Sequence, residues 1–414
     1  MSPAVAVSGI GIVSPFGTTK HSFVDNLLQG RSAIAPLTGF DTSQCATTLA
    51  AQTTTFQPTD WLPPMRLRRL ERTGVYAVAL TRLAFEDAGR EPKPEGDDDT
   101  GVVLGTWTAG GQSSETYLEA LFMGGPQMAP ALLFDSTVGN AAASLTALEH
   151  KLRGPNATVS HKEASGLVAI ASAVDMLRLG RAKHLVTGGV DAIFETFYRG
   201  YDCFQVMSPA RTFSRGVAPF DRERSGFVLG EGGVGLWLEN ADSDARVPVA
   251  QHGWILGTAE SSAAVPLNTW PTSPGPLART MRSALDDAGL SPADVHVVYA
   301  SANATRALDL VEAAAIGALF AGTSTVVTSI KGAIGEAGVS SAASCAAALL
   351  CGGQGMVPPI AGLVQPDPAT DGLTLAREAT AAPGPIALVN GFASGGTLCS
   401  VVVRARTSMP STPS

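Results

Sequence analysis

Short apolar runs of strand length alternate with longer helical patterns along almost the entire chain. Residues 5–14, 101–106 and 184–191 read as strands, whereas 68–89 and 165–180 repeat their apolar residues with the helical period. Alternation of this kind implies helices packed on the faces of buried, mostly parallel sheets. We therefore expect an α/β fold.

The second half of the chain repeats the same mixture of elements. Strands are expected at 249–260, 295–301 and 386–392, and helices at 276–289, 309–322 and 340–353. The similar order hints at an internal duplication, with one half at 1–245 and the other at 246–408. The remaining residues, 409–414, are expected to form a disordered tail.

Composition excludes several classes of function. The chain has 414 residues and a formal net charge of −8, and it lacks the basic patch of a nucleic-acid-binding protein. No stretch reaches the roughly 18 apolar residues of a membrane span, and the N-terminus does not read as a secretory signal. We expect a cytoplasmic protein that binds neither nucleic acid nor membrane.

The five cysteines show no metal-binding or redox pattern. Cys45, Cys203, Cys345, Cys351 and Cys399 form no CxxC pair and no grouping with histidine. Free, buried thiols in a reducing compartment are the simplest interpretation. No metal site and no cofactor are expected.

Four arginines form the densest basic cluster in an otherwise acidic chain. Arg66, Arg68, Arg69 and Arg72 fall within seven residues of one another. They either solvate a helix face or offer a local basic area to an acidic partner such as a carrier protein.

The stretch VSHKEASGLVAI at 159–170 turns sharply from a strand into a helix, a common place to mount a nucleophile. The turn contains no cysteine, and Glu163 stands in it instead. Ser165 is expected to cap or pack the helix, since a nucleophilic serine needs a nearby base. His161 is expected to be structural or to lie at an interface. Glu163 either accepts backbone N–H groups and stays ionised, or occupies a cavity and is partly protonated.

Several ordered motifs resemble those of β-ketoacyl synthases in the thiolase superfamily. The most specific is VAPFDRERSGFVLGEGGVGLWLE at 217–239, which is similar to the family's PFDxxRxGFxxGEGxG segment. The first strand (7–17), the nucleophile turn with its helix (156–192), the lysine loop SIKGAIGEAG and the glycine-rich turn NGFASGGT follow the family's order. The resemblance implies a thiolase-like fold whose duplicated halves form a layered α-β-α-β-α architecture.

The family's chemistry requires a cysteine that carries the acyl chain and two histidines that assist decarboxylation and stabilise the enolate. By this resemblance, the cysteine falls on Glu163, and the histidines fall on Ser301 and Glu336. All three groups are therefore missing. Supporting positions are kept at Lys331, Asp309 and Glu312.

This combination resembles the chain length factor, or ketosynthase β subunit, of bacterial type II polyketide synthases. The resemblance implies a subunit without autonomous activity that forms a heterodimer with a ketosynthase α subunit and meets acyl carrier protein through the complex. Many members of this subfamily carry glutamine where this chain has Glu163. An ionised glutamate cannot donate a hydrogen bond to a developing enolate oxygen as an amide can.

The subfamily's β subunit contributes to an interface tunnel that limits the length of the growing chain. The corresponding segment here is TWTAGGQSSETYLEALFMGGP, followed by ALLFD. If 112–122 is a helix, Gln112, Glu115 and Glu119 share one face, and Thr116 lies on another. The glutamates are either solvent-exposed or polar plugs of the tunnel, and Phe134 and Phe122 are apolar alternatives. Ser394 replaces a phenylalanine that gates the pocket of many active members.

Two other functions remain open at this point. The chain could be a malonyl-carrier-protein decarboxylase or an acyltransferase that uses Glu163. It could also be a homodimer that binds acyl ligands without processing them.

Overall fold

The computed structural model describes residues 3–209, 217–240 and 251–407. Eleven strands form one sheet in the order β12-β10-β9-β14-β15-β8-β1-β7-β6-β4-β5, and two short pairs, β2-β3 and β11-β13, stand apart. The strands are β1 (Val5–Val13), β2 (Ile34–Pro36), β3 (Leu49–Ala51), β4 (Thr100–Gly105), β5 (Asn156–Val159), β6 (His184–Asp191), β7 (Gly232–Asn240), β8 (Gly253–Ser262), β9 (Val297–Tyr299), β10 (Val326–Thr328), β11 (Met356–Val357), β12 (Thr374–Leu375), β13 (Thr380–Ala381), β14 (Ile386–Phe392) and β15 (Thr397–Ala405).

The helices lie on both faces of this sheet and between its two parts. They are α1 (Lys20–Leu28), α2 (Pro64–Leu67), α3 (Arg72–Asp87), α4 (Gly111–Gly124), α5 (Ala141–His150), α6 (Ser165–Arg178), α7 (Glu195–Cys203), α8 (Gly275–Ala288), α9 (Arg306–Leu319), α10 (Lys331–Ile334) and α11 (Gly338–Gly353). Short 3-10 turns include η2 (Ala131–Ser136) and η3 (Lys162–Ala164).

The two parts of the sheet repeat one strand order. In the first, β1-β7-β6-β4-β5 corresponds element by element to β8-β15-β14-β9-β10 in the second. The parts join where Val5–Val7 of β1 pair with Gly253–Ile255 of β8. The repeated order agrees with the duplication expected from the sequence. The proposed boundary at 245 falls within 241–250, outside the described residues, as does the tail 409–414.

The expectation of mostly parallel sheets was wrong for the middle of the sheet. The pairs β14-β15, β15-β8, β8-β1, β1-β7 and β7-β6 are antiparallel, and parallel pairing is confined to the outer strands. The last two strands of the second half, 386–392 and 397–405, are joined by a short turn rather than a helical crossover, and only antiparallel strands can be connected so tightly.

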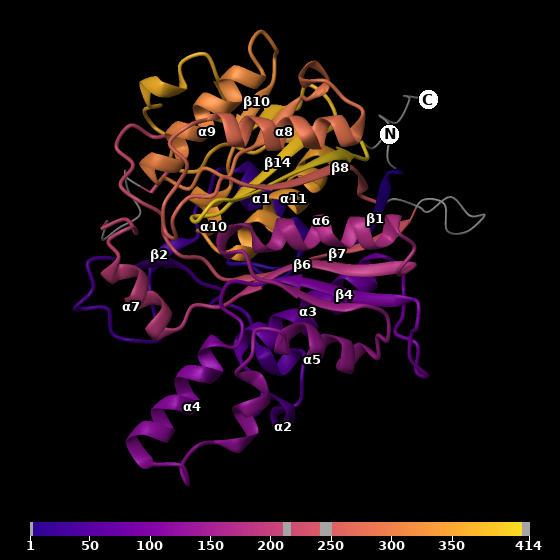
Figure 1. Cartoon of the computed structure of the whole chain (residues 1–414), viewed down its shortest axis with the longest axis vertical. Coiled ribbons are helices and arrows are strands. Elements are labelled where there is room, and N and C mark those ends of the chain that lie inside the picture. Colours follow the sequence, from indigo (N-terminus) through magenta and orange to yellow (C-terminus); the bar gives the residue numbers. More distant parts are fainter. Residues whose placement is uncertain (1–2, 210–216, 241–250, 408–414) are drawn as a thin grey trace.

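The helices complete an α-β-α-β-α sandwich, as expected (Figure 1). Helices α3 and α5 cover β1, β7 and β4 on one side, and α8 covers β8 and β15 on the other with α9 beside it. The middle layer consists of α6 and α11, which contact strands of both parts of the sheet. A site at the start of α6 or α11 is therefore built from both halves.

Small residues bring the middle layer close to its neighbours. A Cβ atom on Gly105 of β4 would lie 2.1 Å from the carbonyl oxygen of Ser165, and one on Gly166 would lie 2.8 Å from Ala342 and from the Gly338 carbonyl. Side chains at these glycines would push α6 away from β4 and α11. The many Ala and Gly residues thus allow close packing between layers.

Some element boundaries differ from the sequence prediction. The helix expected from residue 68 begins at Arg72, because residues 68–71 form a turn after the short helix α2. The alternating segment at 226–240 forms a strand only from Gly232. Before it, Gly226 has φ 139° and the Gly230 N–H donates to the carbonyl of Glu336, so this segment crosses to the lysine loop instead of continuing the strand.

Candidate functional site

Glu163 lies in η3 at the start of α6 and is almost completely buried, with 1% of its surface exposed. Its carboxylate accepts hydrogen bonds from the backbone N–H of Ser394 (3.1 Å) and from the Ser394 hydroxyl (2.8 Å). Ser394 belongs to the turn between β14 and β15. A first-half carboxylate is thus held by a second-half turn.

Burial raises the pKa of Glu163, against the opposing effects of Lys162 and of the hydrogen bonds from Ser394. Its carboxylate is stabilised by the backbone N–H of Glu163 itself, at the helix start, and by both donors of Ser394. The turn of 393–397 thus adds donors that the sequence did not predict, and the charge state of Glu163 stays a prediction.

Glu336, where the resemblance implies the second family histidine, forms a buried ion pair with Lys331. The Lys331 ammonium lies 2.7 Å from Glu336 Oε2, and the Asn303 amide donates to the same oxygen at 2.7 Å. The backbone N–H of Ala337 donates to the other oxygen. Burial raises the pKa of Glu336 to about 7, opposed by Lys331 and assisted by the negative charge of Glu163.

Ser301, where the resemblance implies the first family histidine, connects the same lysine to a third carboxylate. Lys331 donates to the hydroxyl oxygen of Ser301 at 3.2 Å, and the backbone N–H of Ser301 donates to Glu312 at 2.9 Å. The Asn390 amide donates to the same Glu312 oxygen at 2.9 Å, while Oε2 of Glu312 has no partner among the described residues. Burial raises the pKa of Glu312 to about 7.

Asp309 supports the loops around this cluster rather than the cluster itself. It accepts the backbone N–H groups of Asn303 and Phe220 and lies 3.1 Å from Nε of Arg224. Burial raises the pKa of Asp309 to about 6, and Arg224 opposes this rise. Of the three kept residues, Lys331 and Glu312 therefore lie within the cluster, and Asp309 braces its loops.

The centre formed by Glu163, Ser301, Glu336, Lys331 and Glu312 holds neither a thiol nor an imidazole. No cysteine or histidine forms a hydrogen bond with any of these side chains in the described part of the chain. We call these five residues the degenerate centre. It can hold protons and charge, but it has no group that could carry an acyl chain as a thioester.

The neighbouring residues in the turn are structural. The Ser165 hydroxyl accepts the backbone N–H of His161 at 2.8 Å and lies 2.7 Å from the carbonyl of Lys162, so Ser165 shapes the turn. His161 is exposed, and its ring bonds to Thr397 at 3.1 Å.

The cysteines are mostly buried, as expected. Cys203 is the exception, because it lies exposed at the end of α7. No group of three or more His, Cys, Asp or Glu residues among those described could hold a metal ion. Within the same residues, no helix is both long and apolar enough to cross a membrane.

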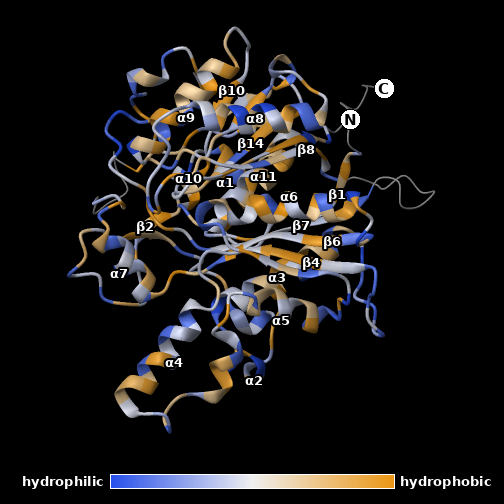
Figure 2. Ribbon diagram, viewed as in Figure 1, coloured by the Kyte–Doolittle hydropathy of each residue, from blue (hydrophilic) through white to orange (hydrophobic). Residues whose placement is uncertain are grey.

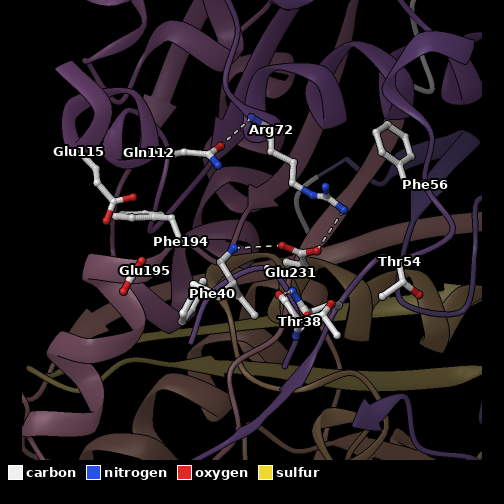
Figure 3. A pocket seen from close by; sticks show the side chains of 13 residues that line it. Thr38, Phe40, Thr54, Phe56, Arg72, Gln112, Glu115, Phe194, Glu195 and Glu231 are labelled. Atoms are coloured by element: carbon white, nitrogen blue, oxygen red, sulfur yellow. Dashed lines mark hydrogen bonds and ion pairs between the residues drawn. The ribbon is translucent and has the colours of Figure 1, made fainter. Parts of the chain in front are cut away.

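A cavity of about 490 Å³ lies between the starts of α3, α4 and α7 (Figure 3). Gln112 and Glu115 line it, beside the ion pair between Arg72 and Glu231. Gln112 accepts the backbone N–H of Arg72 at 3.2 Å, and Glu115 accepts that of Thr196 at 2.7 Å. The side-chain oxygens of these two tunnel candidates therefore accept hydrogen bonds from backbone N–H groups in the first turns of α3 and α7.

The other tunnel candidates lie outside this cavity. Thr116 and Glu119 are exposed on α4, and Phe134 of η2 is 60% exposed with its ring against Tyr117. Helix 112–122 was predicted correctly, but Glu119 does not join Gln112 and Glu115 in the cavity wall. The position of a tunnel relative to these residues stays a prediction.

Residues 111–136 form an arm that projects from the body of the protein (Figure 1), and orange, apolar segments cover much of it (Figure 2). Its exposed apolar side chains are Leu118, Phe122, Met123, Met128, Leu132 and Phe134. The base of the arm is fixed, because Glu71 accepts the backbone N–H groups of Gly110 and Ser113 at the start of α4. A rigid, unpartnered apolar projection of this kind is typical of a protein interface.

The basic cluster does not form one surface. Arg72 turns inward to Glu231, and Arg66 pairs with Glu149 at 2.9 Å. Arg68 and Arg69 remain exposed after α2. Arg66 is exposed as well, and the four arginines belong to two helices and the turn between them, so the interpretation as a single helix face was wrong.

Comparison with known families agrees with this geometry. The profile of the β-ketoacyl synthase N-terminal domain matches residues 2–243, and that of the C-terminal domain matches residues 252–364. The chain belongs to the β-ketoacyl synthase family. All five residues of the degenerate centre therefore lie within the matched domains.

Individual relatives include both enzymes and subunits. The chain is 30% identical to 3-oxoacyl-[acyl-carrier-protein] synthase 2 of Synechocystis sp., over 95% of each chain. It is 31% identical to the tetracenomycin polyketide synthase ketoacyl synthase beta subunit of Streptomyces glaucescens, over 88% of this chain and 89% of that one. Among solved structures, it resembles the ishigamide ketosynthase/chain length factor with a TM-score of 0.90 and 26% identity, over 99% of this chain and all of that one.

Sequence reasoning missed several residues of the site, among them Asn390, which donates to Glu312. Asn303 donates to Glu336, although nothing in SANATRALDL singles it out. Lys162 lies next to Glu163 in the turn and donates to Ser394 at 2.6 Å. Its position immediately before Glu163 was the one available signal.

Proposed function

We propose that this chain is a non-catalytic ketosynthase-like subunit that pairs with an active β-ketoacyl synthase. Within the pair it helps to set polyketide chain length through a tunnel at the interface, and acyl carrier protein meets it through the complex. The observation that carries the proposal is the degenerate centre. At the three positions that the resemblance assigns to the family's catalytic groups, Glu163, Ser301 and Glu336 are buried, take part in hydrogen bonds and provide neither a thiol nor an imidazole.

The arm at 111–136 supports the pairing. Phe122 is 78% exposed and Met123 is 85% exposed, on a helix whose base is fixed by Glu71. Side chains of this size are stabilised when a partner covers them. The relatives named as a beta subunit and as a ketosynthase/chain length factor favour a ketosynthase as that partner.

The test is to co-express the chain with an active ketosynthase encoded beside it and to measure the mass of the complex. We expect one copy of each chain and condensation of malonyl units on carrier protein. Replacing the partner's nucleophilic cysteine should abolish condensation, whereas Glu163→Gln in this chain should change its rate by less than about threefold. Condensation by this chain alone would contradict the proposal.

The arm provides a separate test of the pairing. The double substitution F122D/M123D should prevent the complex from forming, because two charges would be buried without partners. Leu179→Asp is the matched control, since Leu179 is 69% exposed at the end of α6, away from the arm. Equal effects of the two changes would argue against the arm as the interface.

A second candidate function follows from the raised pKa of Glu163. A protonated carboxyl, unlike an ionised one, could donate a hydrogen bond to an enolate oxygen and so assist decarboxylation of malonyl-carrier protein. Incubating the chain with malonyl-carrier protein tests this candidate. Acetyl-carrier protein formed by the natural chain and lost in Glu163→Ala would support it.

A further inference from the structure

Lys162 lies over the degenerate centre and connects separate parts of the chain. Its backbone has φ 51°, in the left-handed region that a lysine seldom adopts. From this turn its ammonium donates to the Ser394 hydroxyl and to the Asn268 side-chain oxygen, both at 2.6 Å. It therefore joins the start of α6 to the turn between β14 and β15 and to the loop after β8.

Two aromatic rings hold the same ammonium from the other side. Nζ of Lys162 lies 5.6 Å from the ring centroid of Trp107 and 5.9 Å from that of Tyr201. Both distances are within the range of a cation–π interaction. The cation is thus fixed between two oxygens and two rings.

Ser394 transmits this fixation to Glu163. Its hydroxyl accepts from Lys162 and donates to Glu163, and its backbone N–H donates to Glu163 as well. The loop that carries Asn268 is tied to the same turn, because Ala263 donates to the carbonyl of Gly396. The half-buried Lys162 consequently closes a set of contacts above a carboxyl group that is 1% exposed.

We infer that Lys162 is a latch that excludes acyl thioesters from the degenerate centre. A thioester approaching Glu163 from this side must separate Lys162 from Ser394 and Asn268 and withdraw its charge from both rings. The inference rests on the proposed function and makes it more specific. In the pair, the partner alone carries acyl groups, and Lys162 keeps them out of the degenerate centre of this chain.

The test restores a thiol under the latch. Glu163→Cys places a cysteine at a helix start, where its pKa falls and any accessible thiol reacts rapidly. Cys203→Ser removes the exposed native cysteine. In this C203S background, the rate of alkylation of E163C by iodoacetamide is followed by peptide mass spectrometry, with the full chain alone and in its complex.

We expect slow alkylation of E163C while Lys162 is present and at least a tenfold increase when Lys162→Ala is added. Lys183→Ala is the matched control, because that lysine pairs with Asp99 on the surface after α6 and should leave the rate unchanged. A thiol at 163 that reacts as fast as Cys203 of the natural chain would overturn the latch, and so would a rate that Lys162→Ala does not change.

A second measurement keeps the natural carboxyl and avoids the new thiol. Hydrogen exchange at the backbone N–H of Ser394, which Glu163 accepts, should accelerate at least tenfold in Lys162→Ala. Unchanged exchange would also overturn the inference. Both measurements can be made without the partner, so a failure to form the complex would contradict the proposed function while the latch is still decided.

Discussion

Nζ of Lys331 lies 2.7 Å from Oε2 of Glu336, and neither side chain is more than 1% exposed. An ion pair so deeply buried adds little net stability, but each charge depends on the other, because an unpaired charge in this environment is very unfavourable. By the resemblance, the interaction joins a kept lysine to a residue that stands in place of a family histidine. The coupling free energy of this ion pair therefore reports on the stability of the degenerate centre.

Lys331→Met should destabilise the chain by roughly 3–5 kcal/mol, because Glu336 loses its counter-charge. Adding Glu336→Gln should recover much of this loss, since no charge then remains to be paired. Urea unfolding of the two single variants and the double variant gives the coupling free energy. Additive effects of the two changes would show that the pair is not coupled.

Glu312 should make the folded chain less stable as the pH rises. Its pKa is raised to about 7 in the folded chain, whereas an unfolded glutamate titrates near 4.3. The folded state therefore binds the extra proton, and its stabilising effect is complete below about pH 4 and is lost as pH rises to about 7. Between pH 5 and 8, this effect should lower the free energy of unfolding by on the order of 2–3 kcal/mol, and Glu312→Gln should abolish that decrease.

The measurement for Glu312 is thermal unfolding between pH 5 and pH 8. The natural chain and Glu312→Gln should unfold at similar temperatures at pH 5, and the variant at a higher temperature at pH 8. Glu86→Gln is the control, because that carboxylate is exposed beside Arg82 and should leave the profile unchanged. Parallel profiles for the natural chain and Glu312→Gln would exclude this residue as the cause.

Gly166→Ala should destabilise the middle helix layer by about 2 kcal/mol or more. The added methyl would lie 2.8 Å from Ala342 Cβ and from the Gly338 carbonyl, so α6 and α11 would have to separate. Gly200→Ala, on α7, meets nothing within 4 Å and should be neutral or stabilising by up to about 1 kcal/mol. Chemical unfolding of both variants makes the comparison, and similar effects would disprove close packing at Gly166.

Phe134→Ala should lengthen the products of the reconstituted pair by one or more two-carbon units, if its ring ends the tunnel. Mass spectrometry of the products would show the shift, and substitutions at Gln112, Glu115, Thr116 and Glu119 extend the series. Leu148→Ala, an equally exposed apolar position on α5, should have no effect. Unchanged product lengths throughout the series would exclude the tunnel assignment for this segment.

The sequence predicted the α/β layers and most elements, because apolar periodicity and glycine stops are local signals. It did not predict the antiparallel centre of the sheet, since strand direction depends on connections and not on the composition of a strand. Residue 163 stays a prediction as the position of a missing nucleophile, because it rests on the resemblance alone. Its bond to Ser394 could not be foreseen, because the two residues are brought together by the docking of the two halves.

The same limit applies to the polar groups around Gln112 and Glu115. Their spacing on a helix predicted one shared face, which the cavity confirms for this pair. Their partners, the helix starts at Arg72 and Thr196, lie far away in the sequence. Periodicity predicts which side of a helix a residue occupies, but not which backbone group forms a hydrogen bond with it.

The division of the centre between the two halves also has a consequence for how the chain reaches its native state. Glu163 comes from the first half and Ser394 from the second, and the segment of Glu336 bonds to the backbone of Val228 and Gly230. Until the halves dock, these carboxylates are hydrated and ionised. Docking buries Glu336, whose pKa then rises to about 7. At neutral pH, the final assembly of the protein is therefore expected to take up protons from solution and to slow as the solution becomes more alkaline.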